Sequence, residues 1–443
     1  MNKFLAIFYF AVPLFISLAL FPHGAIALLV AVPFIVAAVF AIKKSGSDQS
    51  AFLIQLFVAA FFVRALCASF IESYGLQTFF GEDAFAHEFH GFLLSRAWAG
   101  LSDLPLELSD WNRPWGLHYL IAAVYTVIDR NPLAISFISA VAGAASSILI
   151  FLCTRRIFKN VTSARIAGVL AAFFPAMIIW SSQILKDGFV VFFVVLTIYA
   201  LIRLQERFSW FYVAVLMFSL LGIFSIRFYV FYFASIACVG SFFFGSERVL
   251  ANGMRWLAIL SIFVIIAGYA GLLTVGNEQV ERLTDLESLQ VSREVLSREA
   301  ESGYGGATDI TTSTGALLAL PIGLINLMLA PFPWQLSSLR SMLPMPEMLV
   351  WWCLIPFGVI GVKYTLTNRF REAIPMILFT LTLTVAYALF QTNVGTAYRQ
   401  RTQIQIFLFI FISVGLAIYK ERREDRKALR HPAARRDLQA GLS

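Results

Sequence analysis

The sequence predicts an all-α, polytopic membrane protein, and two observations carry this prediction. Hydrophobic residues make up 59% of the chain and charged residues 14%, with a mean hydropathy of +0.78. The apolar residues also form runs long enough to cross a bilayer, which takes about 20 residues for a helix. This composition excludes a soluble globular domain.

The apolar runs, at roughly 17–25 residues each, predict about twelve transmembrane helices. The first run has only Lys3 as a charge before it and no small-residue cleavage site before Pro22, so we expect a retained span. The runs start near Phe4, Gly24, Ala51, Leu133, Ala164, Gly188, Ser209, Tyr229, Trp256, Met348, Ala373 and Gln403.

Two further apolar stretches, 115–128 and 315–334, decide the topology. The first is short for a span, and the second contains Pro321, Pro331 and Pro333. If neither crosses, the basic segments fall on one side and the acid-rich loops on the other, as the cytoplasmic preference of Lys and Arg requires. We therefore expect both to be juxtamembrane or re-entrant elements on the outer face, with the N and C termini in the cytoplasm. The domains expected are a transmembrane domain over 1–420, with outer-face loops over 71–132 and 277–346, and a basic cytoplasmic tail over 421–443.

The cysteines and the net charge exclude other classes of site. Four cysteines lie in apolar stretches without CxxC spacing, which indicates neither a disulfide framework nor a zinc site. Much of the net charge of +8 sits in the tail and in short loops between spans. This distribution is typical of the cytoplasmic loops of membrane proteins, and the basic tail could contact anionic lipids. We therefore expect no nucleic-acid partner.

The polar stretch 72–129 is the candidate site, because it gathers acids, histidines and tryptophans between spans. On a helix, Asp83, His87 and His90 share one face, with phenylalanines opposite, which predicts an interfacial helix whose acid and histidines face water. The alternative is a merely solvated face. A second polar and aromatic cluster in the same loop favours a site: Asp110, Trp111, Asn112, Arg113, Trp115, His118 and Tyr119.

Further charged residues lie at the outer ends of expected spans, where a charge is costly unless it is paired or wetted. Together they suit an anionic lipid phosphate, because arginine gives forked donors to phosphate oxygens. Snorkelling to the headgroups is the plain alternative, and for Arg227 alone it is favoured. These candidate substrate-binding residues are Lys186, Asp187, Arg227, Tyr398, Arg399 and Arg401.

The loop 277–313 has helix-like charge patterning followed by a glycine-rich stretch. Two interpretations remain open: a solvated surface helix with a flexible connector, or a mobile lid over the outer-face site.

Several short motifs point to one family: Gly81-Glu82-Asp83-Ala84-Phe85-Ala86, Asn112-Arg113-Pro114-Trp115, Leu152 to Phe158, Phe174-Pro175 with Lys186-Asp187, and Leu320 to Leu324 with Ala330 to Trp334. Together they resemble the GT-C glycosyltransferases that use polyprenyl-phosphate sugars. The branch in question holds protein O-mannosyltransferases, lipid A aminoarabinose transferases and related bacterial polysaccharide transferases. The resemblance is good over residues 81–187 and loose elsewhere.

The resemblance implies the GT-C fold and an inverting transfer at the outer face of the bacterial inner membrane, in cell-surface polysaccharide assembly. The implied partners are a polyprenyl-phosphate sugar donor, membrane lipids, and a glycan, lipid or protein acceptor. An acid in the first outer loop is the catalytic base in this family. Here the order Glu82-Asp83 is reversed from the common one, which leaves both candidates open, and the shared face with the histidines favours Asp83.

The resemblance also bears on the remaining roles in the site. Asn112, Arg113, Trp111 and His118 are expected to bind substrate. The family is divided on metal use, so a divalent cation, Mg²⁺ or Mn²⁺, is an optional cofactor. Its ligands would be Asp83, His87, His90 and Asp187.

Two other functions were weighed. A transporter needs charges near the bilayer midplane, whereas here they gather at span ends, and the deep Arg64 lies near the outer end of its span. A Wzy-like polysaccharide polymerase or O-antigen ligase differs in using an oligosaccharide diphosphate donor. The sequence alone does not distinguish it from a glycosyltransferase that uses a polyprenyl-phosphate sugar.

Overall fold

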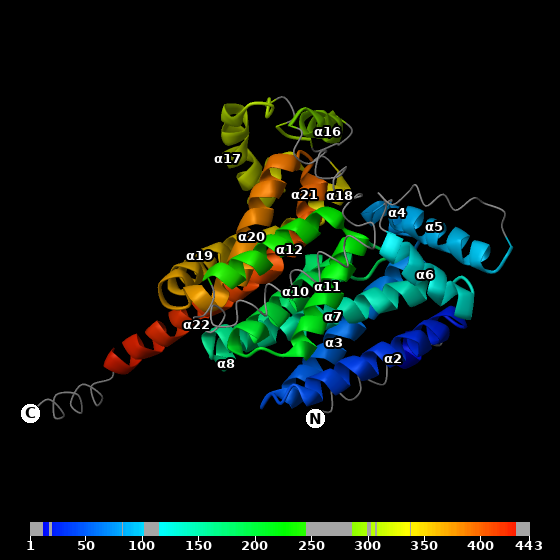
Figure 1. The fold of residues 1–443 in the computed structure, drawn as a ribbon, viewed down its shortest axis with the longest axis horizontal. Helices are drawn as coiled ribbons and strands as arrows, with labels where there is room; N and C mark the ends of the chain where they lie inside the picture. Colours follow the sequence, from blue (N-terminus) through cyan, green and yellow to red (C-terminus); the bar gives the residue numbers. More distant parts are fainter. Residues whose placement is uncertain are drawn as a thin grey trace, which may run out of the picture.

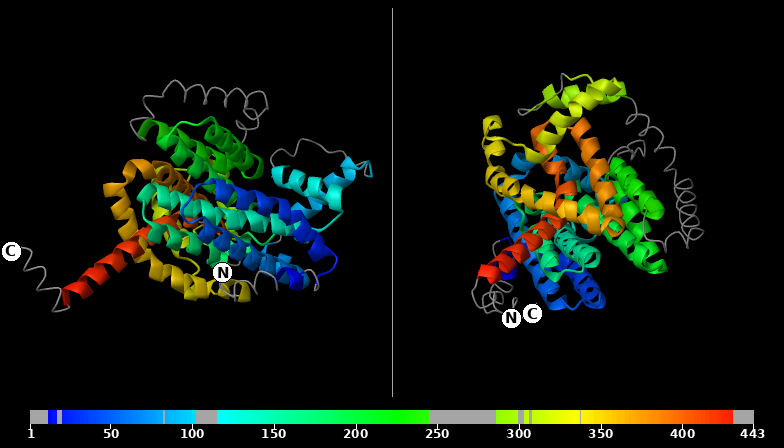
Figure 2. Two further views of the ribbon diagram at one scale, coloured as in Figure 1. Left: turned by 90° about the horizontal axis from the view of Figure 1, so that it is seen from below. Right: turned by 90° about the vertical axis from the view of Figure 1, so that its left-hand side faces the viewer.

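The computed structural model describes residues 12–16, 20–81, 83–101, 115–244, 286–298, 303–305, 308–336 and 338–430. Within these ranges the chain is helical, and its β pairing is limited to one isolated bridge between Gly303 and Asn393. Most long helices pack into one bundle, from which the last helix projects towards the C-terminus (Figure 1). The left-hand view of Figure 2 shows the same helix projecting from the bundle.

Seven helices of the described residues are long and apolar enough to cross a membrane, which confirms an all-α polytopic membrane protein. They correspond to the predicted runs near Gly24, Ala51, Leu133, Gly188, Met348, Ala373 and Gln403. They are α2 (His23–Lys44), α3 (Ser50–Ser73), α7 (Pro132–Phe158), α10 (Lys186–Glu206), α19 (Met345–Asn368), α20 (Phe370–Phe390) and α22 (Thr402–Arg430).

Three other predicted spans form shorter helices. The run near Ala164 is divided into α8 (Val161–Phe173) and α9 (Pro175–Trp180), and those near Ser209 and Tyr229 form α11 (Trp210–Ile226) and α12 (Phe228–Phe244). The runs near Phe4 and Trp256 begin outside the described residues.

Several smaller helices belong to the two expected outer-face loops. The stretch 115–128 is a single 14-residue helix, as its short apolar length predicts, and α5 packs beside it at one end of the bundle (Figure 1). These helices are α4 (Gln77–Phe80), α5 (Asp83–Trp98), α6 (Trp115–Ile128), α16 (Leu286–Arg298), α17 (Ser313–Leu329), the 3-10 turn η2 (Pro333–Gln335) and α18 (Leu339–Met342). One further short helix, α21 (Val394–Gln400), lies between α20 and α22.

Asparagines define where several helices begin. Asn131 accepts a hydrogen bond from the amide of Ala134 at 3.4 Å, and Pro132 follows it at the first helical position, where a missing N–H costs nothing. Asn393 caps α21 in the same way, accepting from the amide of Gly395 at 2.8 Å. This cap fixes the start of the short helix that carries Arg399.

The break between α8 and α9 is held by two buried charged side chains. Pro175 has no N–H, so the carbonyl of Ala171 loses its helical partner. Arg64 donates to that carbonyl at 3.3 Å and to the carbonyl of Ala172 at 2.7 Å. On the other side of the break, Glu347 accepts from the amide of Ala176 at 2.8 Å. An unsatisfied backbone group away from water costs several kcal/mol, roughly, so both contacts matter.

Arg64 therefore binds the backbone at the site of this break. Its Nε also donates to Ser181 Oγ at 2.8 Å, in the turn that leads to α10. Gly143 lies against the same turn, where an added Cβ would come within 2.5 Å of Ser181 Oγ. The deep charge that a transporter would place on its substrate path is here part of the scaffold.

The expectation that the polar face of α5 turns to water is wrong for His87. The phenylalanines Phe85 and Phe89 are exposed, whereas His87 is only 8% exposed and packs against α6. Its neighbour Glu88 is also buried and accepts from Tyr125 of α6 at 2.9 Å. A helical wheel shows which residues share a face, but the packing partner decides which face is covered.

The described part of the stretch 277–346, the expected second outer loop, docks on the junction between α20 and α21. Arg293 of α16 is buried and donates to the carbonyls of Leu389 and Gly305. Thr392 donates back to the carbonyl of Arg293 at 2.7 Å, and its own carbonyl accepts from the amide of Tyr304. Within the stretch 277–313 the described residues form α16, and its buried arginine is anchored next to α21. Both interpretations of this loop stay predictions.

Candidate functional site

The site is built around one acid that opens a helix. Asp83 is the first residue of α5, where the helix dipole favours a negative charge, and its side chain is 54% exposed. Its Oδ2 accepts from Nη1 of Arg399 at 2.9 Å, although 316 residues separate the two in the chain. Helix α5 and the short helix α21 therefore meet at this contact.

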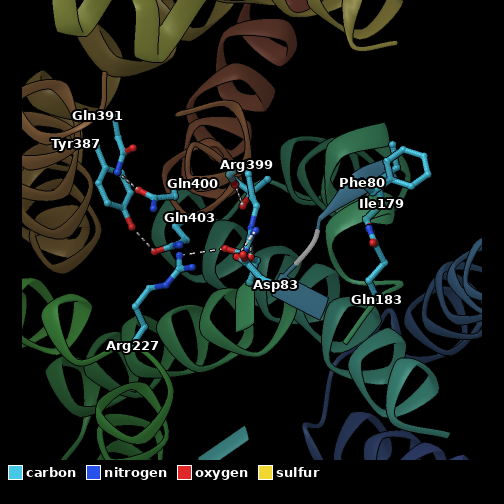
Figure 3. A network of polar contacts seen from close by, with 12 residues as sticks. Phe80, Asp83, Ile179, Gln183, Arg227, Tyr387, Gln391, Arg399, Gln400 and Gln403 are labelled. Carbon is cyan, nitrogen blue, oxygen red and sulfur yellow. Dashed lines mark hydrogen bonds and ion pairs between the residues drawn. The ribbon is translucent and has the colours of Figure 1, made fainter. Parts of the chain in front are cut away.

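A second, buried acid fixes the same arginine. Asp187, in the first turn of α10, has a side chain with no exposed area. Its Oδ2 accepts from Nε of Arg399 at 2.6 Å, and its Oδ1 lies 3.0 Å from Nη1 of Arg227. Figure 3 shows Arg227, Arg399 and Asp83 pointing towards one centre from different elements.

The alternation of charges keeps this cluster ionised. Burial raises the pKa of Asp83, but the charge and hydrogen bond of Arg399, with a smaller contribution from Lys186, lower it by more. The pKa of its carboxyl therefore lies below the ordinary range. Burial lowers the pKa of Arg399, and Asp187 and Asp83 raise it by more, so the guanidinium stays charged. An ionised carboxylate and a fixed cation lie side by side.

Lys186 adds a positive charge beside the two acids. It begins α10 next to Asp187, and its charge acts on both Asp83 and Asp187. Among the described residues no carboxylate lies within ion-pair distance of its ammonium group. Lys186 thus places a positive charge next to Asp83 and Asp187, and Arg227 is held by Asp187.

A histidine pair lies one helical turn from Asp83. His87 Nδ1 is 3.2 Å from His118 Nε2, which joins α5 to α6. Burial, the positive charge of Lys186 and the ring of His118 lower the pKa of His87 to about 3. His87 is therefore neutral at physiological pH and adds no charge to the site.

These features were compared with known proteins. The family model described as dolichyl-phosphate-mannose-protein mannosyltransferase matches residues 112–270. The match covers less than half of the chain and supports a GT-C superfamily glycosyltransferase. The matched stretch includes Lys186, Asp187 and Arg227, and ends well before Arg399. A comparison with curated proteins found no match.

Two residues expected to bind substrate lie away from the charge cluster. Arg401 is fully buried, and its Nη1 donates to carbonyls at the end of α17, at 3.2 Å for Met328 and 3.0 Å for Ala330. Tyr398 is buried and donates to Glu347 at 2.7 Å. The structure gives both residues roles in packing the last helices and does not bring them to the charge cluster.

The four residues expected to ligate a divalent cation do not form a metal site in the structure. Both oxygens of Asp187 face arginines, and His87 faces His118. His90 hydrogen-bonds the carbonyl of Ala86 at 2.6 Å. Among the described residues no group of three or more His, Cys, Asp or Glu side chains could hold a metal ion.

Four candidate residues lie outside the described part of the chain: Glu82, Trp111, Asn112 and Arg113. Their expected roles stay predictions.

Sequence reasoning missed Glu88 and the salt bridge it forms. Glu88 accepts from Arg130 at 2.6 and 2.8 Å, so it links α5 to the short connection between α6 and α7, while Tyr125 connects it to α6. The sequence contained one signal for this contact: Glu88 follows His87 in an expected helix, and Tyr125 and Arg130 lie just before the next span. This contact fixes the orientation of the helix that begins with Asp83.

Proposed function

We propose that the chain is an inverting glycosyltransferase that moves a sugar from a polyprenyl-phosphate donor to a glycan, lipid or protein acceptor. The observation that carries this proposal is the contact between the exposed carboxylate of Asp83 and the guanidinium of Arg399, which Asp187 orients. A base and a phosphate-binding cation then stand next to each other. The family match supports a membrane glycosyltransferase.

The reaction follows from these roles. The acceptor hydroxyl oxygen attacks the anomeric carbon of the sugar while Asp83 takes the hydroxyl proton. A new carbon–oxygen bond forms on one face, and the bond to the phosphate oxygen breaks on the other, which inverts the configuration. The electron pair leaves with the lipid phosphate. Arg399 and Lys186 stabilise the negative charge that grows there.

The orientation is part of the proposal. The basic segments and the acid-rich loops separate best if the loop with Asp83 lies outside the cytoplasm. The catalytic domain then spans residues 1–420, the tail 421–443 lies in the cytoplasm, and transfer takes place on the outer face of the bacterial inner membrane. This location fits a role in cell-surface polysaccharide assembly.

A transfer assay tests the function. The purified full-length protein is incubated in detergent with radiolabelled polyprenyl-phosphate sugars and the release of labelled sugar is measured. We expect Asp83→Asn to lower the rate by about 10²–10⁴-fold, the usual contribution of a general base. Asp309→Asn is the matched control, because Asp309 is an exposed acid of the second outer loop that hydrogen-bonds Thr311.

Two results would change the assignment. Full activity of Asp83→Asn together with loss in Glu82→Gln would move the base by one residue. Labelling of a tag beside Asp83 only from the cytoplasmic side would contradict the orientation.

A further inference from the structure

Arg399 binds two carboxylates of very different character. Asp187 is fully buried and is held from its other side by Arg227 at 3.0 Å, so its contact with Nε of Arg399 is fixed. Asp83 is 54% exposed and binds the terminal Nη1. An ion pair that water reaches is weak, whereas a buried one is costly to break. The bond to Asp83 is therefore the replaceable one.

We propose that Arg399 exchanges partners during the reaction: the donor phosphate displaces Asp83 from Nη1, and this displacement frees the Asp83 carboxylate to accept the proton of the acceptor. The inference rests on the proposed function and adds an order of events to it. The donor binds first, because the base is occupied by Arg399 until a phosphate takes its place.

The local geometry favours a phosphate at this position. With Nε bound to Asp187, the terminal nitrogens of the guanidinium remain as the fork that matches two phosphate oxygens. Gly81 lies beside Nη1, where even an added Cβ would stay 3.8 Å away, so no side chain from that residue covers the nitrogen. Lys186 supplies a second positive charge nearby.

Once displaced, Asp83 stays close to the reacting centre. It is anchored by the first turn of α5, and that helix is fixed to α6 through His87 and His118 and to Arg130 through Glu88. Only the side chain of Asp83 has to rotate. The carboxylate then lies beside the phosphate that leaves, where the attacking hydroxyl of the acceptor needs a base.

The test is a binding measurement on the full-length protein in detergent, with undecaprenyl phosphate and, separately, inorganic phosphate as probes. We expect Asp83→Asn to tighten binding of the lipid phosphate about two- to fivefold, since the competing exposed ion pair is gone. Inorganic phosphate separates the charge contribution from that of the lipid chain, and tightening for both probes assigns the effect to the phosphate. Asp309→Asn removes the same charge from an exposed acid and should leave binding unchanged.

A double variant decides whether Arg399 is responsible. In an Arg399→Gln background, Asp83→Asn should no longer tighten binding of the phosphate probes. Tightening that persists in this background would overturn the exchange. An equal tightening by the control Asp309→Asn would overturn it too. Unchanged or weaker binding in Asp83→Asn alone would overturn it as well. If binding fails to tighten but transfer is lost, the exchange is wrong and the proposed base stands. If binding tightens while transfer continues, the exchange stands and the base lies elsewhere.

Discussion

Removing the charge of Asp187 should destabilise the protein strongly. In Asp187→Asn the guanidinium of Arg227, whose side chain is 6% exposed, loses its counter-charge, and Arg399 keeps only its exposed contact with Asp83. Breaking a buried pair by removing one partner costs about 3–5 kcal/mol. Asparagine retains an oxygen that can accept from one arginine, so we expect the lower end, about 3 kcal/mol. This is a large fraction of a typical stability of about 5–15 kcal/mol.

The assay is denaturant unfolding of the detergent-solubilised protein, with a double-mutant cycle. Arg227→Met should also be destabilising, but the double variant should lose less than the two single losses combined, by at least about 1 kcal/mol. Asp48→Asn is the control. The side chain of Asp48 is 63% exposed and its ion pair with Arg155 is long, at 3.9 Å, so we expect a loss of unfolding free energy below about 0.5 kcal/mol. A loss below about 1 kcal/mol in Asp187→Asn would refute the reasoning, since a structural counter-ion for two arginines cannot be that dispensable.

Three further predictions concern the elements around the site. Glu88→Gln should lower the unfolding free energy by about 1.5 kcal/mol, the low end for hydrogen bonds to a charged group, because Arg130 is 42% exposed. An unchanged unfolding free energy would show that this contact does not stabilise the fold. As the pH falls from 6.5 towards 4.5, an unfolded histidine gains a proton that folded His87, with its pKa of about 3, does not, so stability falls. Thermal unfolding midpoints at pH 7 and 5 should therefore converge in His87→Gln, and an unaltered difference would contradict the buried neutral state. Gly143→Ala should lower the unfolding midpoint by an amount equivalent to about 1–3 kcal/mol, since its Cβ would come within 2.5 Å of Ser181 Oγ; a neutral effect would show that the turn can move.

The spanning helices could be predicted from the sequence because hydrophobic length is a local property. The runs near Gly24 and Leu133 became single long helices, as their length requires. The run near Ala164 did not, because Pro175 interrupts the hydrogen-bond ladder and distant side chains stabilise the interruption. Periodicity and length do not reveal that Arg64 is available for this purpose.

The candidate site was only partly predictable, for the same reason. The sequence indicates that acids and cations such as Asp83 and Arg399 end on one membrane face, and the structure places those two in contact. It does not indicate which cations meet, so Arg401 was grouped with Arg399 although it points into the helix packing. Glu88 was missed because the contact that buries an acid is a property of the folded chain.

The interruption at Phe174–Pro175 also constrains how the chain assembles in the bilayer. Synthesis proceeds from the N-terminus, yet the amide of Ala176 finds its acceptor in Glu347, 171 residues later. Until α19 has been inserted, that amide needs water or a temporary neighbour. The early helices therefore reach their final arrangement only when the late ones arrive, and a chain that stops before α19 should leave the turn that leads to Asp187 unfinished.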